Sequence, residues 1–299
     1  PGQINGESLR HVFRVDQIRK SAKLYGVVAD LVGHSISPAV HNKAFQVRRI
    51  NAVYLPLLVH SGQLKDFFQM AELMGLQGAS VTIPHKQSIL RYLDTVDPLT
   101  RRIGAVNTIW RRNGKWRGVN TDVDGVRAPL ERRIRLNHST VLVAGSGGAA
   151  RGALFTLVDA GAKVCITGRN DDKVRALAKV SGATPLTRQE AESRNFDALV
   201  HCTPLGMYPK VDGCFFEENL PADIVFDMVY NPIETPLLAR ARAEGRVAIP
   251  GLEMFLEQAV RQFEIWTEEE APRSSMSNAI TNALEAYNQA RENQAMASR

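Results

Sequence analysis

Short apolar runs alternate with amphipathic stretches along most of this chain, and this alternation constrains its fold more than any other feature. A short apolar run between turn residues is typical of a buried strand, and an apolar period of about 3.6 residues is typical of a helix. In the first half we predict strands over residues 24–29, 52–59 and 78–82, a helix over residues 63–74, and helices that begin at Ser37-Pro38 and at Pro84. In the second half we predict strands over residues 140–144, 163–167, 198–201, 224–229 and 247–249. Strands and helices that alternate in this way predict an α/β protein with two doubly wound halves.

The C-terminal part is predicted to be helical. After Gly251 the segment LEMFLEQAVRQFEIW carries apolar residues at i, i+3, i+4 spacing, and one more helix is predicted over residues 275–291. Gly161 and Gly245 stand where the glycines that end helices belong. We expect the two C-terminal helices to return to the first half.

The segment AVNTIWRRNGKWRGVNTD interrupts the alternation with a predicted hairpin. Asn113-Gly114 between two alternating segments is typical of a type I′ turn. A two-residue loop at this point pairs Arg112 with Lys115. If the pairing continues to the ends of the segment, Asn107 and Asp122 become diagonal neighbours on one face of the hairpin.

Length and composition exclude several classes of protein. The chain has 299 residues, of which 44% are hydrophobic and 23% charged, which is ordinary for a protein of two domains with a buried core. No apolar run approaches the roughly 18 residues that span a bilayer, and the polar start is unlike a secretory signal. The three cysteines lack a metal-ligand spacing, so we expect no metal site and a cytoplasmic location. The net charge of +6 lies partly in arginine pairs without interleaved aromatic residues, which favours small anionic ligands over nucleic acid.

The predicted strand over residues 140–144 runs directly into a glycine-rich turn. Its residues give the spacing G-x-G-x-x-A at the start of a predicted helix and are Gly145, Ser146, Gly147, Gly148, Ala149 and Ala150. Glycines at this point allow a tight turn and let backbone N–H groups approach a pyrophosphate at the helix N-terminus. The strand before the turn and the helix after it favour a dinucleotide site over the alternative, a glycine-rich turn without a ligand.

The end of the next predicted strand indicates which dinucleotide binds. An acidic residue there would bind the ribose 2′-hydroxyl of NAD, but this chain has Thr167-Gly168-Arg169-Asn170, followed by Lys173. Arginine offers planar, charge-assisted hydrogen bonds that match a phosphate. Arg169 with Lys173 therefore favours NADP, and the alternative is that Asp171 or Asp172 serves the ribose of NAD.

Polar residues gather after the predicted strands of the first half, at the edge where ligands of open α/β sheets bind. They are Ser35, Ser37, Ser80, Thr82, Lys86, Asn107, Asn120 and Asp122. Hydroxyl, amide, ammonium and carboxylate groups together suit a small polyhydroxylated acid. Each residue also has a structural explanation: Ser37 can cap a helix, Asn120 can end a strand, and Lys86 can be a solvated helix residue.

Taken in order, these segments resemble a known family. GHSISP, SVTIPHK, GAVNTI, GVNTD, GSGGAAR and GLEMFLEQAVRQFEIW are similar to the motif series of shikimate dehydrogenases, from about Tyr25 to Trp266. The resemblance implies a substrate-binding catalytic domain over residues 1–123, an NADP-binding Rossmann domain over residues 124–252, and C-terminal helices over residues 253–299 that pack on the substrate domain.

The resemblance also implies roles for individual residues. Lys86 and Asp122 become the catalytic pair, and Ser35, Ser37, Thr82, Asn107 and Gln258 become substrate contacts. The implied cofactor contacts are the glycine-rich residues 145–150, Thr167, Arg169, Lys173, Thr203, Met228, Tyr230 and Gly251. Lysine ordinarily carries a proton near neutral pH, so Lys86 is expected to protonate the alkoxide that forms when the ketone is reduced.

Three departures from the family pattern stand out. Ala29 and Leu31 replace a glycine and a proline, Ser80 stands where many members have asparagine, and His201-Cys202-Thr203 replaces an Asn-Ala-Thr stretch. In addition, Pro1-Gly2-Gln3 resembles the end of a type I 3-dehydroquinate dehydratase, so we expect an upstream dehydratase domain.

The sequence therefore predicts an NADP-dependent oxidoreductase of aromatic amino acid biosynthesis that reduces 3-dehydroshikimate to shikimate. One alternative is a quinate/shikimate dehydrogenase, which Ser35, Ser37, Thr82 and Arg169 argue against. The other is a non-catalytic regulator that binds a metabolite, which the presence of both Lys86 and Asp122 argues against.

Overall fold

The computed structural model describes residues 6–30, 32, 35–208, 210–217 and 219–297. They form two compact units: the first comprises Pro1–Thr121 with Ala259–Arg299, and the second comprises Asp122–Gln258. The predictions on Pro1-Gly2-Gln3, Leu31 and the first two residues of GHSISP fall outside the described residues.

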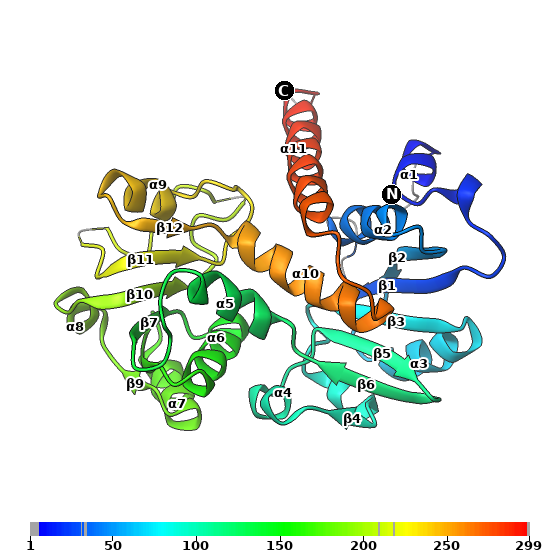
Figure 1. Cartoon of the computed structure of the whole chain (residues 1–299). Coiled ribbons are helices and arrows are strands. Elements are labelled where there is room, and N and C mark those ends of the chain that lie inside the picture. The colour runs from blue at the N-terminus through cyan, green and yellow to red at the C-terminus, as the bar shows by residue number, and fades with distance from the viewer. Residues whose placement is uncertain (1–5, 31, 33–34, 209, 218, 298–299) are drawn as a thin grey trace. The chain divides into compact units, whose positions relative to one another are not determined.

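The first unit contains a mixed six-stranded sheet in the order β2-β1-β3-β5-β6-β4 (Figure 1). Its strands are β1 (Lys23–Ala29), β2 (Ala52–Leu58), β3 (Leu76–Val81), β4 (Thr95–Val96), β5 (Thr108–Arg112) and β6 (Lys115–Val119). β1 is parallel to both β2 and β3. The chain steps outward from β1 to β2 and then back past β1 to β3, so right-handed crossovers put the connecting helices on opposite faces. These helices are α2 (Ser37–Val47) and α3 (Leu64–Leu73).

β5 and β6 form the predicted hairpin. Asn113 and Gly114 have φ values of 52° and 74°, as a type I′ turn requires, and Arg112 pairs with Lys115. The expected continuation of the ladder to Asp122 is wrong, because β6 ends at Val119 and Asp122 is the first residue of a helix. Side-chain hydrogen bonds replace the ladder beyond Val119 and bend the chain out of the sheet.

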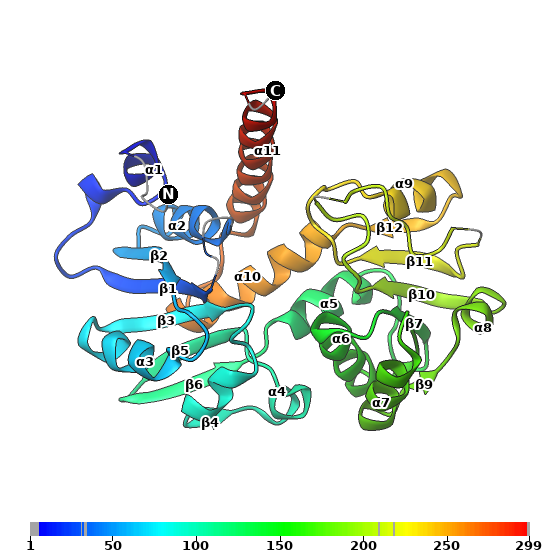
Figure 2. The same ribbon diagram turned by 180° about the vertical axis from the view of Figure 1, so that it is seen from behind.

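From Ala259 onward the C-terminal helices belong to the first unit, so they return to it as predicted. α10 (Gly251–Thr267) brings Trp266 against the sheet, where its Nε1 donates to the Ile109 carbonyl at 3.1 Å. Gly78 on β3 permits this approach, because a Cβ there would lie 2.7 Å from the Trp266 ring. α11 (Arg273–Ala297) packs beside α2 (Figures 1 and 2). The opposite face of the sheet is covered by α3, with Phe67 and Phe68 in an apolar cluster.

The second unit contains a parallel six-stranded sheet in the order β12-β11-β10-β7-β8-β9. Its strands are β7 (Thr140–Ala144), β8 (Lys163–Thr167), β9 (Thr184–Pro185), β10 (Phe196–His201), β11 (Ala222–Asp227) and β12 (Val247–Ile249). Its helices are α5 (Asp122–Glu131), α6 (Gly148–Asp159), α7 (Asp171–Ser181), α8 (Arg188–Glu192) and α9 (Pro236–Ala243). The chain winds from β7 toward β9 and then returns to β10 on the other side of β7. This strand order is that of a Rossmann domain, and its switch point lies between β7 and β10.

Several elements differ from the sequence prediction. The segment from Pro84 does not begin an α-helix: residues 84–87 form turns that lead into the 3₁₀ helix η2 (Ser88–Tyr92), because hydrogen bonds such as His85 N–H to Thr82 O span only three residues. The N-cap of α2 is Ile36 and not Ser37, which is the first helical residue. Several elements were not predicted, among them α1 (Gly6–His11), η1 (Val15–Gln17), α4 (Pro98–Ile103), α5 and the short strands β4 and β9. Gly161 and Gly245 have φ values of 83° and 72° just after α6 and α9, which confirms their predicted place.

Candidate active site

The glycine-rich turn of the second unit exposes backbone N–H groups at the start of α6. Gly145 has a φ of 129°, and a Cβ there would lie 3.0 Å from the Cys202 carbonyl oxygen, so only glycine fits. Gly147 is the N-cap of α6 and offers no side chain to the helix terminus. A Cβ at Gly147 or Gly148 would meet nothing within 4 Å. The turn therefore leaves open space beside a helix N-terminus, which fits a pyrophosphate.

Two cations follow β8, Arg169 shortly after the strand and Lys173 in the first turn of α7. Arg169 and Lys173 are both exposed, and the Asn170 side chain caps α7 by accepting the Lys173 N–H at 2.9 Å. Asp172 pairs with Arg175 of the same helix at 2.7 Å. Thr167 is fully buried, and its hydroxyl finds no partner among the described residues. This arrangement favours a phosphate over a ribose hydroxyl as the ligand of Arg169.

The sheet register brings the remaining predicted cofactor contacts of the second unit to the same edge. Ala144 pairs with Thr167 on one side and with His201 on the other, and His201 pairs with Asp227. The segments that follow these strands contain Thr203, Met228 and Tyr230. Gly251 belongs here because a Cβ at its position would lie 2.5 Å from the Val229 carbonyl oxygen.

In the first unit, backbone hydrogen bonds hold three predicted residues together. The Val81 N–H donates to the Asn107 carbonyl at 2.7 Å, and the Val106 N–H donates to the Lys86 carbonyl at 2.7 Å. Thr82 follows Val81 directly at the end of β3. The turn that carries Lys86 therefore lies against the segment that carries Asn107, and Thr82 lies between Val81 and Lys86 along the chain.

Asn107 is 3% exposed and its side-chain oxygen is fully engaged. This Oδ1 accepts hydrogen bonds from the Thr121 N–H at 2.7 Å, the Thr121 hydroxyl at 3.1 Å and the Thr108 hydroxyl at 2.7 Å. Any contact of the Asn107 side chain with a ligand is therefore made through its amide N–H groups, so Asn107 would act as a donor to a substrate oxygen.

A chain of hydrogen bonds that the sequence did not reveal runs through Gln262, which is 1% exposed. Gln262 Nε2 donates to the Thr108 hydroxyl at 3.0 Å, and Gln262 Oε1 accepts from the Ser80 hydroxyl at 3.3 Å. The Tyr54 hydroxyl is hydrogen-bonded to Ser80 and to Ser37. Burial raises the pKa of Tyr54 well above its ordinary value, so this phenol keeps its proton. Gln262 thus links the Ser37 and Ser80 side of the site to Asn107.

The sequence did contain a signal for Gln262, since it is a polar residue one turn after Gln258 on an otherwise apolar face of the predicted helix.

Ser35 lies before α2, where its Oγ accepts the Ser37 N–H at 3.3 Å. His41, one turn after Ser37, donates from Nε2 to Gln262 Oε1 at 3.2 Å and stacks on Tyr54 with ring centroids 4.6 Å apart. Burial lowers the pKa of His41 to about 3.

Asp122 and Gln258 belong to the second unit. Asp122 is in the first turn of α5, where a negative charge suits the helix dipole. Gly125, one turn later, would carry a Cβ 2.9 Å from Met254 and 3.6 Å from the Gln258 Cβ. Asp122 and Gln258 therefore lie on neighbouring helices. The pairing of Asp122 with Lys86 stays a prediction.

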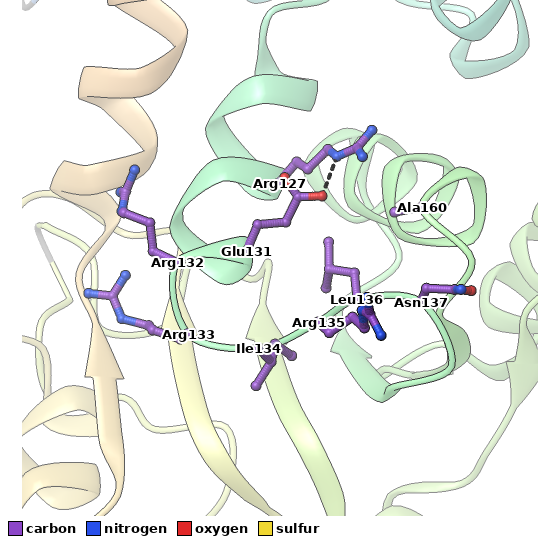
Figure 3. A pocket seen from close by; sticks show the side chains of 9 residues that line it. All are labelled: Arg127, Glu131, Arg132, Arg133, Ile134, Arg135, Leu136, Asn137 and Ala160. Carbon is purple, nitrogen blue, oxygen red and sulfur yellow. Dashed lines mark hydrogen bonds and ion pairs between the residues drawn. The ribbon is translucent and has the colours of Figure 1, made fainter.

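A cavity of about 500 Å³ at the C-terminal end of α5 is separate from these residues (Figure 3). Its arginines are largely paired: Arg127 with Glu131 at 2.6 Å, and Arg132 and Arg133 with Glu253 at 2.9 and 2.7 Å. Carboxylates thus pair with three of the four arginines that line the cavity, the fourth being Arg135.

Two absences hold for the part of the chain that the structure describes. It contains no helix long and apolar enough to cross a bilayer. It also contains no group of three or more His, Cys, Asp or Glu side chains that could hold a metal ion.

The chain is similar to curated proteins of known activity. It is 38% identical over 269 residues to the shikimate dehydrogenase (NADP(+)) of Oleidesulfovibrio alaskensis, with 88% of this chain and 96% of that protein covered. The chain belongs to the shikimate dehydrogenase family. The family's substrate binding domain matches residues 27–109, and the shikimate 5'-dehydrogenase C-terminal domain matches residues 251–281.

Solved structures of this family share the fold. A shikimate dehydrogenase crystallised in complex with NADP+ has a TM-score of 0.83 and 35% identity, with 90% of this chain and 98% of that chain covered. The enzyme from Thermus thermophilus, in complex with NADP(H) and shikimate, has a TM-score of 0.80 and 30% identity, with 87% of this chain and 99% of that chain covered. The stretches matched by the family domains contain Ser35, Ser37, Thr82, Lys86, Asn107, Gly251 and Gln258.

Proposed function

We propose that this protein is an NADP-dependent shikimate dehydrogenase, which reversibly reduces 3-dehydroshikimate to shikimate in aromatic amino acid biosynthesis. The observation that carries the proposal is the glycine-rich turn of a Rossmann sheet beside exposed Arg169, in a chain that matches NADP-dependent relatives over nearly their whole length. The second unit is then the NADP domain. The first unit, with the C-terminal helices, is the substrate domain.

The proposed substrate site uses donors that match a cyclic polyol acid. Ser35 and Ser37 would donate to the substrate carboxylate, and Thr82, Asn107 and Gln258 would contact its carboxylate and ring hydroxyls. The three hydrogen bonds to the Asn107 Oδ1 fit this role, because any contact of this side chain with a ring oxygen would then be made by its amide N–H groups. The buried chain through Gln262 connects Ser37 with Asn107 and would keep these two residues in place before the substrate arrives.

The proposed cofactor site combines backbone and cations. The N–H groups of the turn from Gly145 to Ala150 would hold the pyrophosphate, and Arg169 with Lys173 would hold the 2′-phosphate. Thr167, Thr203, Met228, Tyr230 and Gly251 would line the rest of the site. When bound, the dinucleotide supplies or accepts the hydride at the substrate carbon.

Lys86 and Asp122 would handle the proton. In the reduction, the ketone carbon gains a hydride and its oxygen gains a proton, which the Lys86 ammonium donates as the negative charge develops. Asp122 would orient both the ammonium and the substrate hydroxyl. In the oxidation, Lys86 takes the same proton back.

The proposal also includes the cellular location of the protein and a domain upstream of this chain. A cytoplasmic location is supported by the free thiols of Cys165, Cys202 and Cys214, because oxidising compartments favour disulfides. An upstream 3-dehydroquinate dehydratase domain is supported by the resemblance of Pro1-Gly2-Gln3 to the end of that enzyme.

The loss of NADPH absorbance with 3-dehydroshikimate tests the function, and the oxidation of shikimate and of quinate with NADP or NAD tests its specificity. We expect rapid turnover of the shikimate pair with the phosphorylated cofactor. Faster turnover of quinate with NAD would identify a quinate dehydrogenase. Binding of NADP and shikimate without turnover would identify a regulator.

A further inference from the structure

A buried histidine and aspartate lie behind Thr203 at the carboxyl edge of the second sheet. His201, which ends β10, is 1% exposed, and Asp227, which ends β11, is fully buried. His201 Nδ1 lies 2.9 Å from Asp227 Oδ1, and His201 Nε2 lies 2.5 Å from Thr203 Oγ1. The imidazole therefore bridges a buried carboxylate and a hydroxyl that is only half-buried.

Asp227 decides which nitrogen of the ring carries the proton. Its Oδ1 also accepts the Val229 N–H at 3.0 Å, and its Oδ2 accepts the Thr235 hydroxyl at 2.6 Å. Since an ionised carboxylate only accepts, His201 Nδ1 must be the donor in their shared hydrogen bond. In the neutral imidazole Nε2 is then an acceptor, so the Thr203 hydroxyl donates its proton to it.

This arrangement gives the Thr203 hydroxyl a fixed polarity. Its one proton goes to His201, and one lone pair accepts the Leu205 N–H at 3.3 Å. Among the described residues nothing occupies the second lone pair. The hydroxyl therefore offers an acceptor to a ligand that presents an N–H or O–H group.

The order of the strands indicates which part of a dinucleotide reaches Thr203. β8 and β10 lie on opposite sides of β7, whose end carries the glycine-rich turn. A pyrophosphate at that turn leaves the two halves of a dinucleotide on opposite sides of β7. Arg169 follows β8 and suits the phosphorylated adenosine half, so Thr203, which follows β10, lies on the nicotinamide side.

We propose that His201 and Asp227 are positioning residues that hold the Thr203 hydroxyl as an acceptor for the carboxamide N–H of the nicotinamide. The inference rests on the proposed NADP site and adds residues that neither the sequence motifs nor the reaction had required. A purely structural link between β10 and β11 would not need the second ring nitrogen, because the two strands already pair through their backbones.

The test compares the affinity for NADP with that for its 3-acetylpyridine analogue, in which a methyl group replaces the carboxamide NH₂. Dissociation constants are measured by titration for the wild type and for Thr203→Val, Thr203→Ser and His201→Phe. The wild type and Thr203→Ser should bind NADP about three- to tenfold more tightly than the analogue, as one hydrogen bond predicts. Thr203→Val and His201→Phe should lose this preference, because their affinity for NADP falls while their affinity for the analogue stays unchanged.

Thr235→Val is the matched control, because it removes a hydroxyl that donates to the same Asp227 but does not reach Thr203. It should keep the wild-type preference even if its melting temperature falls. Binding of 2′,5′-ADP, which contains only the adenosine half, should be equal in all variants.

Two outcomes would overturn the proposal: an unchanged preference in Thr203→Val or His201→Phe, or a parallel loss of NADP and 2′,5′-ADP binding. The comparison needs only binding. A wild type that binds NADP but does not turn over 3-dehydroshikimate would therefore refute the proposed activity without deciding this test.

Discussion

The two units of this chain prepare their candidate sites by opposite means. In the first unit the polar groups are buried side chains that bond one another, such as Asn107 and Thr108. In the second unit the groups are backbone amides beside Gly147 and Gly148 together with exposed Arg169. A small polyol has few atoms to recognise, so its partners must be fixed beforehand, whereas a dinucleotide offers phosphates that amides and cations bind at the surface.

The difference has a consequence for mutations. Changes in the first unit should alter stability and binding together, because each side chain there also satisfies its neighbours. Changes at the exposed cations of the second unit should alter binding alone. All three tryptophans, Trp110, Trp116 and Trp266, lie in the first unit, so tryptophan fluorescence follows the unfolding of that unit specifically.

The largest expected effect is that of Lys86→Ala on turnover. Loss of the proton donor should lower kcat by about 10²–10⁴-fold, with little change in the affinity for shikimate. Lys65→Ala, which removes an exposed lysine from α3, is the control and should leave kcat unchanged. Turnover of Lys86→Ala at the wild-type rate would show that Lys86 is not the proton donor.

The second largest expected effect is that of Arg169→Ala on the affinity for NADP relative to that for NAD. Arg169→Ala should weaken NADP binding by about 10- to 150-fold, as charge-assisted hydrogen bonds to a phosphate predict, and should leave NAD binding and the melting temperature unchanged. Arg175→Ala removes an equal charge from the following helix, where Arg175 pairs with Asp172, and is the matched control. An equal loss of NADP and NAD affinity in Arg169→Ala would contradict the phosphate role.

The third effect concerns stability in the first unit. Asn107→Ala would leave the buried Thr121 N–H without its acceptor, so we expect a loss of about 1–3 kcal/mol in the free energy of unfolding. Urea titration followed by tryptophan fluorescence measures this loss. Arg112→Ala, which breaks an exposed ion pair with Glu268, should change the same quantity by less than about 1 kcal/mol. An equal free energy of unfolding in the two variants would contradict the view that the buried side chains of the first unit stabilise the fold.

The fourth effect is a pH dependence confined to the first unit. Burial lowers the pKa of His41 to about 3 in the folded state, so below the ordinary value of 6.5 the unfolded chain binds a proton that the folded chain does not. The free energy of unfolding is therefore highest above pH 6.5. It decreases as the pH is lowered, by about 2 kcal/mol between pH 7 and pH 5. His41→Gln keeps a donor for Gln262 but cannot titrate, so its urea midpoint should fall less over this range. Parallel curves for the two proteins would exclude His41 as the cause.

Sequence patterns predicted both sheets and the local features that one segment determines alone. The alternation of apolar runs indicated the long strands, and the Asn113-Gly114 turn fixed the hairpin register. The family resemblance extended this to the residues of the site. The prediction failed in two places. At Asp122 the Asn107 side chain bonds Thr121 and ends the ladder, and after Pro84 backbone turns replace a helix.

The sequence by itself determined the two-unit α/β fold and the glycine-rich turn, because apolar periodicity and glycine conformations act over short stretches of chain. Only the tertiary structure showed the long-range hydrogen bonds, such as those from Gln262 to Ser80 and Thr108 and from His201 to Asp227. These partners are far apart in the sequence, and a buried polar group must find a partner wherever the fold puts one. No local pattern encodes that choice, so the fold had to be known before the residues that prepare the site could be found.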